Sequence, residues 1–191
     1  MRKEINIGMF GYGVVGQGLY DVLEKSAGVK AEIRKICVKD RRKKRRLPMH
    51  FFTFDKQDIL EDNQVNLVVE LINDADEAFQ IVKAAMISGK SVVTANKKMI
   101  AEHLSELIDL QEETQTSLLY EGAVCGAIPI IRNLEEYYDN EWLHSVRGIF
   151  NGSTNYILTR MYNNGLDYEV ALKEAQEKGF AECWVKILSS P

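Results

Sequence analysis

The sequence contains little of what marks a disulfide-bonded, metal-binding or membrane protein. Its three cysteines, Cys37, Cys125 and Cys183, are an odd and widely spaced set without a Cys-x-x-Cys pair. Its three histidines are equally scattered, and we assign them no role. No run approaches the roughly 18 apolar residues of a membrane span, and the first residues enter a strand pattern without a signal peptide. We therefore expect a cytoplasmic protein with reduced thiols and no membrane partner.

The composition is that of an ordinary globular protein, since 46% of the 191 residues are hydrophobic and 27% are charged. This excludes a disordered chain and allows one domain, or one domain and part of a second. The net charge of -4 conceals an asymmetry. Lys39–Arg46 (KDRRKKRR) has seven bases and one acid, so this run alone contributes +6.

The basic run has three interpretations. It is a solvated surface loop, a nucleic-acid patch, or a site for a phosphate group of a ligand. The nucleic-acid interpretation is the weakest of the three, because no stacking aromatic side chain is interleaved with the bases. We therefore expect a small-molecule substrate and no nucleic acid partner.

The first forty residues predict a strand, a glycine turn, a helix and a second strand. Ile5–Phe10 is an apolar run, GYGVVGQG follows at Gly11–Gly18, and Ala31–Val38 is the second strand. The intervening helix has one apolar face, formed by Val15, Leu19, Val22 and Leu23. This order predicts a right-handed βαβ unit with parallel strands.

The same alternation continues along the chain. Strands are predicted at 65–72, 91–95 and 117–121, with a helix at 75–88 that ends at Gly89 and another through 100–108. This pattern predicts an α/β fold, a Rossmann-like doubly wound parallel sheet, over residues 1–125. Residues 126–191 are expected to be part of an α+β substrate domain, with a helix after Pro129, a strand at Trp142–Phe150 and a last helix between Asp167 and Gly179.

The glycine turn predicts a dinucleotide site. Gly11, Gly13 and Gly16 form G-x-G-x-x-G. The first glycine permits the tight turn, the second lets pyrophosphate approach the backbone, and the third lets the helix pack on the strand. Phosphates then bind the free N–H groups of the helix N-terminus. The context of strand, turn and helix favours dinucleotide binding over a purely structural turn.

The end of the second strand indicates which dinucleotide is bound. An NAD site usually has an acidic residue there, but this chain has Lys39, followed by Arg41. Both would attract the 2′-phosphate of NADP. Asp40 keeps NAD open as the alternative.

Four later segments join the glycine turn into a recognisable set. They are VVTANKK at 92–98, YEGAVCGAIPII at 120–131, GIFNGSTNYIL at 148–158 and EAQEKGFAE at 174–182. Together they resemble homoserine dehydrogenase over Ile5–Glu182. The resemblance implies an oxidoreductase that interconverts L-aspartate 4-semialdehyde and L-homoserine with NAD(P), in threonine and methionine biosynthesis, and that forms a homodimer.

The resemblance also implies roles for individual residues. Thr94 and Lys97 lie beside the nicotinamide and substrate, and the Lys97 ammonium is the group suited to stabilise the reacting oxygen or pass it a proton. The residues implied to bind the dinucleotide at the turn are Phe10, Gly11, Gly13, Val14, Val15 and Gly16.

The resemblance also implies two further sets of binding residues, one for a cation and one for the substrate. A Na+ ion is implied at Glu121 and the carbonyls of Val124, Gly126 and Ile128, although Cys125 and Ala127 restrict this turn where the family has glycine. The substrate is implied at Asn151, Ser153, Thr154 and Glu182, where Ser153 and Thr154 are alternatively only part of a helix cap.

The sequence departs from the family after Glu182, where CWVKILSSP stands in place of an Asp-Pro pair and later catalytic residues. We therefore expect a truncated chain with an intact nucleotide domain and impaired hydride transfer. The alternative is a non-catalytic NADP-binding remnant or interaction subunit. A semialdehyde dehydrogenase is disfavoured, because Cys125 has no evident histidine partner.

Overall fold

The computed structural model describes residues 4–26, 28, 30–126 and 128–181, and it divides the chain into two compact units, Met1–Asn133 and Leu134–Pro191. The sequence predicts a domain boundary between residues 125 and 126, whereas the boundary between the two compact units lies between residues 133 and 134. The functional domain boundary itself remains a prediction. Each unit is described separately below.

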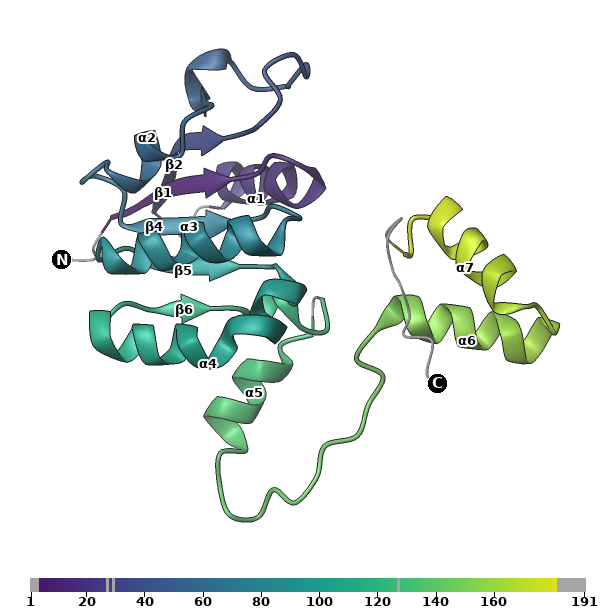
Figure 1. Ribbon diagram of the computed structural model, residues 1–191. Helices are drawn as coiled ribbons and strands as arrows, with labels where there is room; N and C mark the ends of the chain where they lie inside the picture. Colours follow the sequence, from purple (N-terminus) through teal and green to yellow (C-terminus); the bar gives the residue numbers. More distant parts are fainter. Residues whose placement is uncertain (1–3, 27, 29, 127, 182–191) are drawn as a thin grey trace. The chain divides into compact units, whose positions relative to one another are not determined.

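The first unit is built on a six-stranded parallel sheet with the strand order β3-β2-β1-β4-β5-β6 (Figure 1). This is the order of the dinucleotide-binding fold, so the predicted doubly wound sheet is confirmed. The strands predicted for this unit are all present, most of them with shorter ends than predicted, and a two-residue strand, β3, was not predicted. The strands are β1 Ile5–Phe10, β2 Ala31–Cys37, β3 Phe52–Thr53, β4 Leu67–Glu70, β5 Ser91–Thr94 and β6 Leu118–Leu119.

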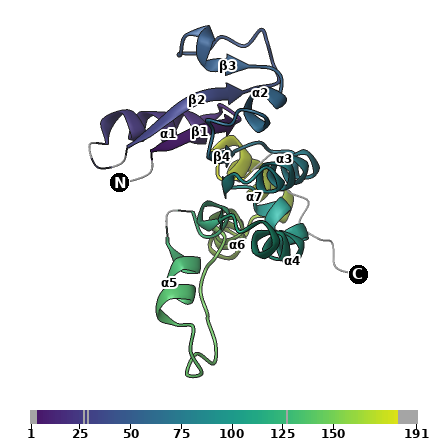
Figure 2. The same cartoon turned by 90° about the vertical axis from the view of Figure 1, so that its left-hand side faces the viewer.

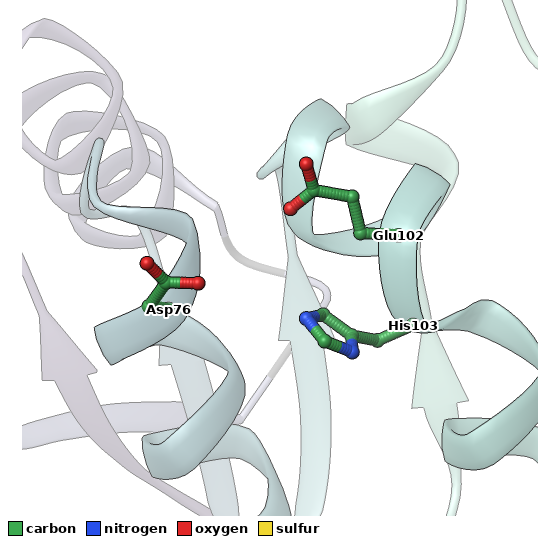
Figure 3. A group of neighbouring side chains, drawn as sticks. All are labelled: Asp76, Glu102 and His103. Carbon is green, nitrogen blue, oxygen red and sulfur yellow. The ribbon is translucent and has the colours of Figure 1, made fainter.

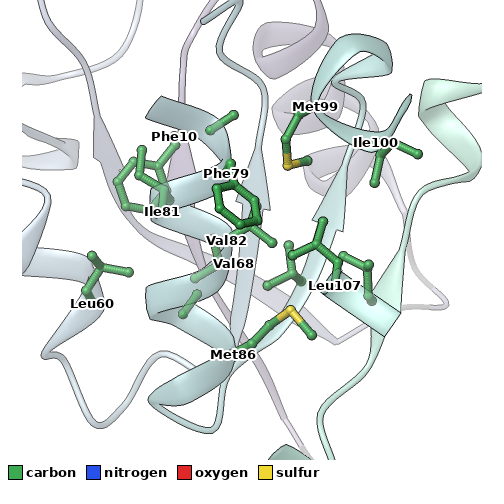
Figure 4. Packing of buried hydrophobic residues seen from close by; sticks show 14 of the residues in the cluster. Phe10, Leu60, Val68, Phe79, Ile81, Val82, Met86, Met99, Ile100 and Leu107 are labelled. Atoms are coloured by element: carbon green, nitrogen blue, oxygen red, sulfur yellow. The ribbon is translucent and has the colours of Figure 1, made fainter. Parts of the chain in front are cut away.

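Helices cover both faces of this sheet. Figure 2 shows α1 (Val14–Lys25) on one side of the strands and α3 (Ala75–Ile87) and α4 (Lys97–Thr114) on the other. Successive strand residues point to opposite faces, so Val68 packs with α3 and α4 while Val69 belongs to the cluster that includes α1. Figure 4 shows the larger of these clusters, in which the side chains of α3 and α4 interdigitate.

Helix α3 begins and ends at residues that favour helix ends. The Asp74 side chain accepts the N–H of Glu77 at the start of α3, and Gly89 follows α3 with φ +74°, as predicted for a C-terminal glycine. The short elements of this unit are a 3₁₀ turn at Met49–Phe51, α2 at Gln57–Leu60 and a second 3₁₀ turn at Glu121–Ala123.

The apolar face predicted for α1 is only partly correct. Leu19 and Leu23 pack on the sheet, but Val15 and Val22 are 59% and 63% exposed. The helix contacts the strands through its buried Gly16, and Tyr20 completes the stripe that begins there. The buried stripe therefore has the i, i+3, i+4, i+7 spacing of a helix that lies against a sheet at a glycine.

The second unit contains two packed helices, α6 (Gly152–Asn164) and α7 (Tyr168–Glu177), and α5 (Ile130–Tyr137) lies across the division between the units. Ile157 packs against Ala171 and Ala175 of α7 and against Ala181, and these residues form the small core of this unit. The Glu174 carboxylate accepts from Lys178 and Arg160, and these bonds lower the pKa of Glu174 to about 2.

The predicted strand at Trp142–Phe150 is wrong. The segment is irregular, and its apolar side chains are exposed, with Trp142 at 85% and Ile149 at 71%. A strand needs a hydrogen-bonded neighbour, and the described residues of the second unit contain no other strand that could pair with it. The apolar residues of this segment alone therefore do not make it a strand.

Gly16 and Gly18 give a matched test of how α1 packs. A Cβ at Gly16 would lie 2.8 Å from the Gly11 carbonyl oxygen, whereas a Cβ at Gly18 would meet nothing within 4 Å. Gly16→Ala should therefore lower the free energy of unfolding by about 1–3 kcal/mol through overpacking. Gly18→Ala should raise it by roughly 0.5–1 kcal/mol, because alanine favours the helix. Thermal unfolding followed by circular dichroism measures both, and equal effects of the two changes would contradict the packing.

Candidate functional site

The turn between β1 and α1 has the backbone geometry that its first glycine allows. Gly11 has φ +96°, a conformation that residues with a Cβ rarely adopt. A Cβ there would also lie 2.7 Å from the carbonyl oxygen of Leu71 at the end of β4. The turn therefore lies against the neighbouring strand, at the carboxyl edge of the sheet.

The other two glycines differ in what surrounds them. Gly16 is held against the Gly11 carbonyl, whereas the space beside Gly13 is open, with nothing within 4 Å of a built Cβ. Gly13 is also the N-cap of α1 and supplies no side-chain cap, so the helix N-terminus is free of a side-chain acceptor. The open side of Gly13 leaves room for a phosphate group to approach the backbone.

A cavity of about 630 Å³ opens at this edge of the sheet. Its walls are the glycine turn at 10–13, the end of β2 and the basic run, the loop at 54–56 and the segment at 71–73 after β4, together with Glu77 and Ile81 of α3. A cavity of this size suits a small ligand. It lies where the strand order reverses between β1 and β4, which is the usual ligand position in doubly wound sheets.

The basic run is divided between this cavity and the protein surface. Lys39, Lys43 and Arg45 line the cavity, but Arg41 is not among its lining residues. The Arg41 guanidinium instead lies over the ring of Phe54 at 4.6 Å. Arg46 pairs with Asp21 of α1. The dinucleotide roles of Lys39 and Arg41 remain predictions, and the geometry favours Lys39 of the two.

Two groups in the cavity have shifted pKa values. The Lys39 ammonium pairs with Glu77, and the hydrogen bond to this carboxylate raises the pKa of Lys39, so the lysine stays charged. Burial raises the pKa of the Cys37 thiol to about 11. Cys37 is therefore protonated at neutral pH and is not an activated nucleophile.

A buried carboxylate organises the ends of β4 and β5. Glu70 is fully buried; its Oε2 accepts the Thr94 hydroxyl at 2.6 Å, and its Oε1 accepts the N–H of Ile72 at 2.6 Å. The Thr94 hydroxyl oxygen in turn accepts the N–H of Asn96 at 3.1 Å. Burial raises the pKa of Glu70, although both hydrogen bonds lower it.

Asn96 extends this network to α4. Its side-chain oxygen accepts the N–H of Met99 as the N-cap of α4, and its side-chain nitrogen donates to the Ile72 carbonyl at 3.0 Å. The sequence analysis did not single out Glu70 or Asn96. The available signals were a glutamate that ends an otherwise apolar strand, and an asparagine directly before a helix pattern.

The network fixes the position of Lys97. Lys97 is the first residue of α4, directly after Asn96, and its side chain is exposed. No hydrogen bond or ion pair to another described residue involves its ammonium group, whereas the neighbouring Lys98 lies 3.8 Å from Glu102. Lys97 is therefore exposed and without a partner among the described residues, whereas Thr94 is buried, and neither residue lines the cavity. Their roles at the nicotinamide and substrate remain predictions.

The turn after β6 bears the predicted cation ligands. Both oxygens of Glu121 accept N–H groups at the start of α5, from Ile131 and Arg132. Cys125 and Gly126 both have positive φ, of 55° and 61°. Glu121 therefore also anchors α5.

The fit of these residues to a monovalent cation is good but incomplete. No hydrogen bond from a described residue ends on the carbonyl oxygens of Val124 or Gly126, so both remain available. The Ile128 carbonyl, by contrast, accepts the N–H of Ile130 at 2.8 Å. Hard oxygen donors of this kind suit Na+.

The predicted substrate residues lie in the second unit. Asn151 is the N-cap of α6 and accepts the N–H of Thr154 at 2.9 Å, and the Ser153 hydroxyl donates to the Phe180 carbonyl. Asn151 and Ser153 thus already have local structural partners. Glu182 lies outside the described residues.

Comparison with known proteins identifies the family. A model of the NAD binding domain of homoserine dehydrogenase matches residues 11–121, and a model of homoserine dehydrogenase matches residues 129–184. The chain belongs to the homoserine dehydrogenase family. A homoserine dehydrogenase of Bacillus subtilis is 38% identical over 189 residues, and one of Corynebacterium glutamicum is 38% identical over 186.

Solved structures of the family agree with this fold. A homoserine dehydrogenase of Thiobacillus denitrificans matches 95% of this chain with a TM-score of 0.80 and 34% identity. A hyperthermophilic archaeal homoserine dehydrogenase in complex with NADPH matches 95% with a TM-score of 0.76 and 28% identity. The chain spans 44% of the first of these structures and 63% of the second.

The chain also spans less than half the length of the related sequences. The chain covers 44% of the Bacillus subtilis protein and 42% of the Corynebacterium glutamicum protein, and these alignments include 94% and 93% of this chain. Within the described residues, every helix is too short or too polar to cross a membrane.

The raised pKa of Glu70 predicts a pH-dependent stability. The folded protein holds the Glu70 proton more tightly than the unfolded chain, whose carboxyl has a pKa of 4.5, so folding should lose stability as the pH rises from 4.5 through the folded-state value. Glu70→Gln removes this titration. The thermal midpoint of wild type relative to Glu70→Gln should therefore fall as the pH rises above 4.5.

The exposed Glu61 provides the control, because Glu61→Gln changes a carboxylate outside the network. Its midpoint should run parallel to that of wild type over the same pH range. A Glu70→Gln curve that is also parallel to wild type would mean that burial does not perturb this carboxyl.

Proposed function

We propose that this chain binds NADP(H) and belongs to an enzyme that reduces L-aspartate 4-semialdehyde to L-homoserine, a step of threonine and methionine biosynthesis. The open side of Gly13 at the free N-terminus of α1, facing a cavity of dinucleotide size, is the observation that supports it most. Family membership supports the reaction. With the reaction we propose a small-molecule substrate, a homodimeric assembly and a cytoplasmic location.

The proposed cofactor site uses the turn and the basic run for different parts of the dinucleotide. The N–H groups that follow Gly13 would hold the pyrophosphate, because the helix dipole favours negative charge there. Lys39, Lys43 and Arg45 would hold a 2′-phosphate in the cavity. Asp40 keeps NAD as the alternative, because a carboxylate can accept from the ribose hydroxyls, although its Oδ1 already accepts the N–H of Arg42.

The proposed chemical step depends on Lys97. The reduced nicotinamide, when bound, supplies the hydride. Hydride addition develops negative charge on the aldehyde oxygen, and the exposed ammonium of Lys97 would stabilise that charge or pass a proton to the oxygen. Glu70 and Thr94 would act by holding the start of α4, through Asn96, in a fixed position.

The proposal also includes residues that bind a cation and residues that bind the substrate. Glu121 with the carbonyls of Val124, Gly126 and Ile128 would hold a Na+ ion, and the two free carbonyls among them support this. The substrate would be held by Asn151, Ser153, Thr154 and Glu182, as the family resemblance implies.

NADPH binding and turnover test the proposal directly. A fluorescence titration of NADPH should show saturable binding to the 191-residue chain. Gly13→Ala should weaken that binding at least about tenfold, because its methyl group enters the space left for the phosphate. Its thermal midpoint without ligand should stay near that of wild type, since the methyl contacts no protein atom within 4 Å.

The same samples are then assayed for NADPH oxidation with L-aspartate 4-semialdehyde. Turnover would show that the chain catalyses the step itself. Binding without turnover would favour the non-catalytic NADP-binding subunit. Equal binding by wild type and Gly13→Ala would refute the proposed phosphate site.

Charge-neutralising variants test the preference for NADP. Lys39→Gln and Arg45→Gln should each weaken NADPH binding about tenfold and leave NADH binding nearly unchanged, because a charge-assisted hydrogen bond contributes roughly 1.5–3 kcal/mol. Arg41→Gln is the matched control, since Arg41 is not among the lining residues and its guanidinium instead stacks on the ring of Phe54. A loss for Arg41→Gln equal to the others would put Arg41 in the phosphate site. Equal losses for NADH and NADPH would contradict a 2′-phosphate site.

A further inference from the structure

Three potential metal ligands converge between α3 and α4, apart from the residues assigned to the cofactor and substrate. Asp76 comes from the first turn of α3, and Glu102 and His103 come from the second turn of α4. Their ligand atoms all lie within 4.8 Å of one another. Figure 3 shows a ring nitrogen of His103 turned toward Asp76 on the other helix, with the Glu102 carboxylate beside it. The three side chains thus come together from two helices that are separated in the sequence by one strand.

The framework beneath these side chains is rigid. The two helices pack through buried residues such as Phe79, Met99 and Leu107 (Figure 4). The His103 ring stacks on Phe79 with the ring centres 3.9 Å apart and the planes 15° apart. This stack covers one face of the imidazole and leaves the nitrogens at its edge, so the ring is oriented before any ligand arrives.

The charges of the cluster are only partly balanced by the described residues, since Glu102 pairs with Lys98 and Asp76 pairs with no cation. Asp76 has no hydrogen bond or ion pair with any described residue, and His103 has only the ring contact with Phe79. The cation nearest to Glu102 is Lys98, at 3.8 Å. The helix dipole accounts for an acid in the first turn of α3. It does not account for a carboxylate and an imidazole that reach toward that acid from another helix.

We propose that Asp76, Glu102 and His103 form a binding site for a divalent transition-metal ion of the zinc class. An imidazole with two carboxylates selects such an ion over Mg²⁺ or Ca²⁺, which prefer oxygen ligands alone. Bonds of about 2.0–2.2 Å place neighbouring ligands roughly 3.4 Å apart in a tetrahedral site. The ligand atoms already lie within 4.8 Å of one another, and both carboxylates are exposed, so their side chains have room to rotate toward that spacing. Water completes the coordination.

A metal ion at this site would tie the starts of α3 and α4 together. Glu102 lies about one and a half turns after Lys97 on the same helix. The ion would therefore stabilise the first unit and hold the start of α4 in place. It would take no part in hydride transfer, and the site does not depend on the proposed cofactor.

Zinc chloride and cobalt chloride are the probes for the test, used with the full chain and without dinucleotide. Calorimetric titration with Zn²⁺ should show one equivalent bound, and saturating Zn²⁺ should raise the thermal midpoint. His103→Phe keeps the ring stack on Phe79 and removes the ligand nitrogens. It should weaken Zn²⁺ binding at least about tenfold, the range seen when even an outer partner of a ligand is lost. Asp76→Asn should weaken it as well.

Glu106→Gln is the matched control. Glu106 lies one turn further along α4 and pairs with Lys83 of α3 across the same helix contact, so this change alters the contact and leaves the cluster intact. It should bind Zn²⁺ as wild type does. The Co²⁺ spectrum should lack the charge-transfer band of a thiolate ligand, which separates this site from binding at the cysteines. Undiminished binding by His103→Phe, a thiolate band, or no binding by wild type would each overturn the proposal.

Discussion

The hydrogen bond between the buried Glu70 carboxylate and the Thr94 hydroxyl is the interaction on which the cofactor edge of this protein depends. A carboxylate is costly to bury unless its oxygens are bonded, and here both oxygens have a donor. Through Thr94 and Asn96 these bonds connect the end of β4, the end of β5 and the start of α4. The segment that leads to Lys97 therefore has a single position relative to the strands.

The glycine turn meets the same edge from the other side. Gly11 lies against the Leu71 carbonyl, and Leu71 follows Glu70 directly. The phosphate-binding turn and the network around Thr94 are thus built on adjacent backbone atoms of one strand end. This common support brings two segments some eighty residues apart in the sequence to one edge of the sheet, as the proposed binding of one dinucleotide requires. It also explains why a doubly wound sheet binds ligands where its strand order reverses.

Most of the first unit could be predicted from the sequence, because its signals are local. The alternation of strands and helices, the G-x-G-x-x-G turn and the glycine after α3 each depend on residues close together in the chain. The two wrong predictions share one cause, because each concerns a feature that depends on contacts with residues distant in the sequence. Trp142–Phe150 has the composition of a strand but no neighbour with which to pair. Val15 and Val22 are apolar, yet the sheet meets α1 along a different stripe.

The sequence by itself determined the fold class and the position of the dinucleotide turn, since these follow from periodicity and from glycines at fixed spacing. It also indicated the family, through four later segments that resemble homoserine dehydrogenase. Only the tertiary structure decided that Lys39, Lys43 and Arg45 of the 39–46 run line the cavity and that Arg41 does not. It also brought Asp76 to Glu102 and His103, which the sequence separates by about one helix and one strand. The physical reason is that side-chain proximity across helices is set by packing of the core, which no local pattern of residues specifies.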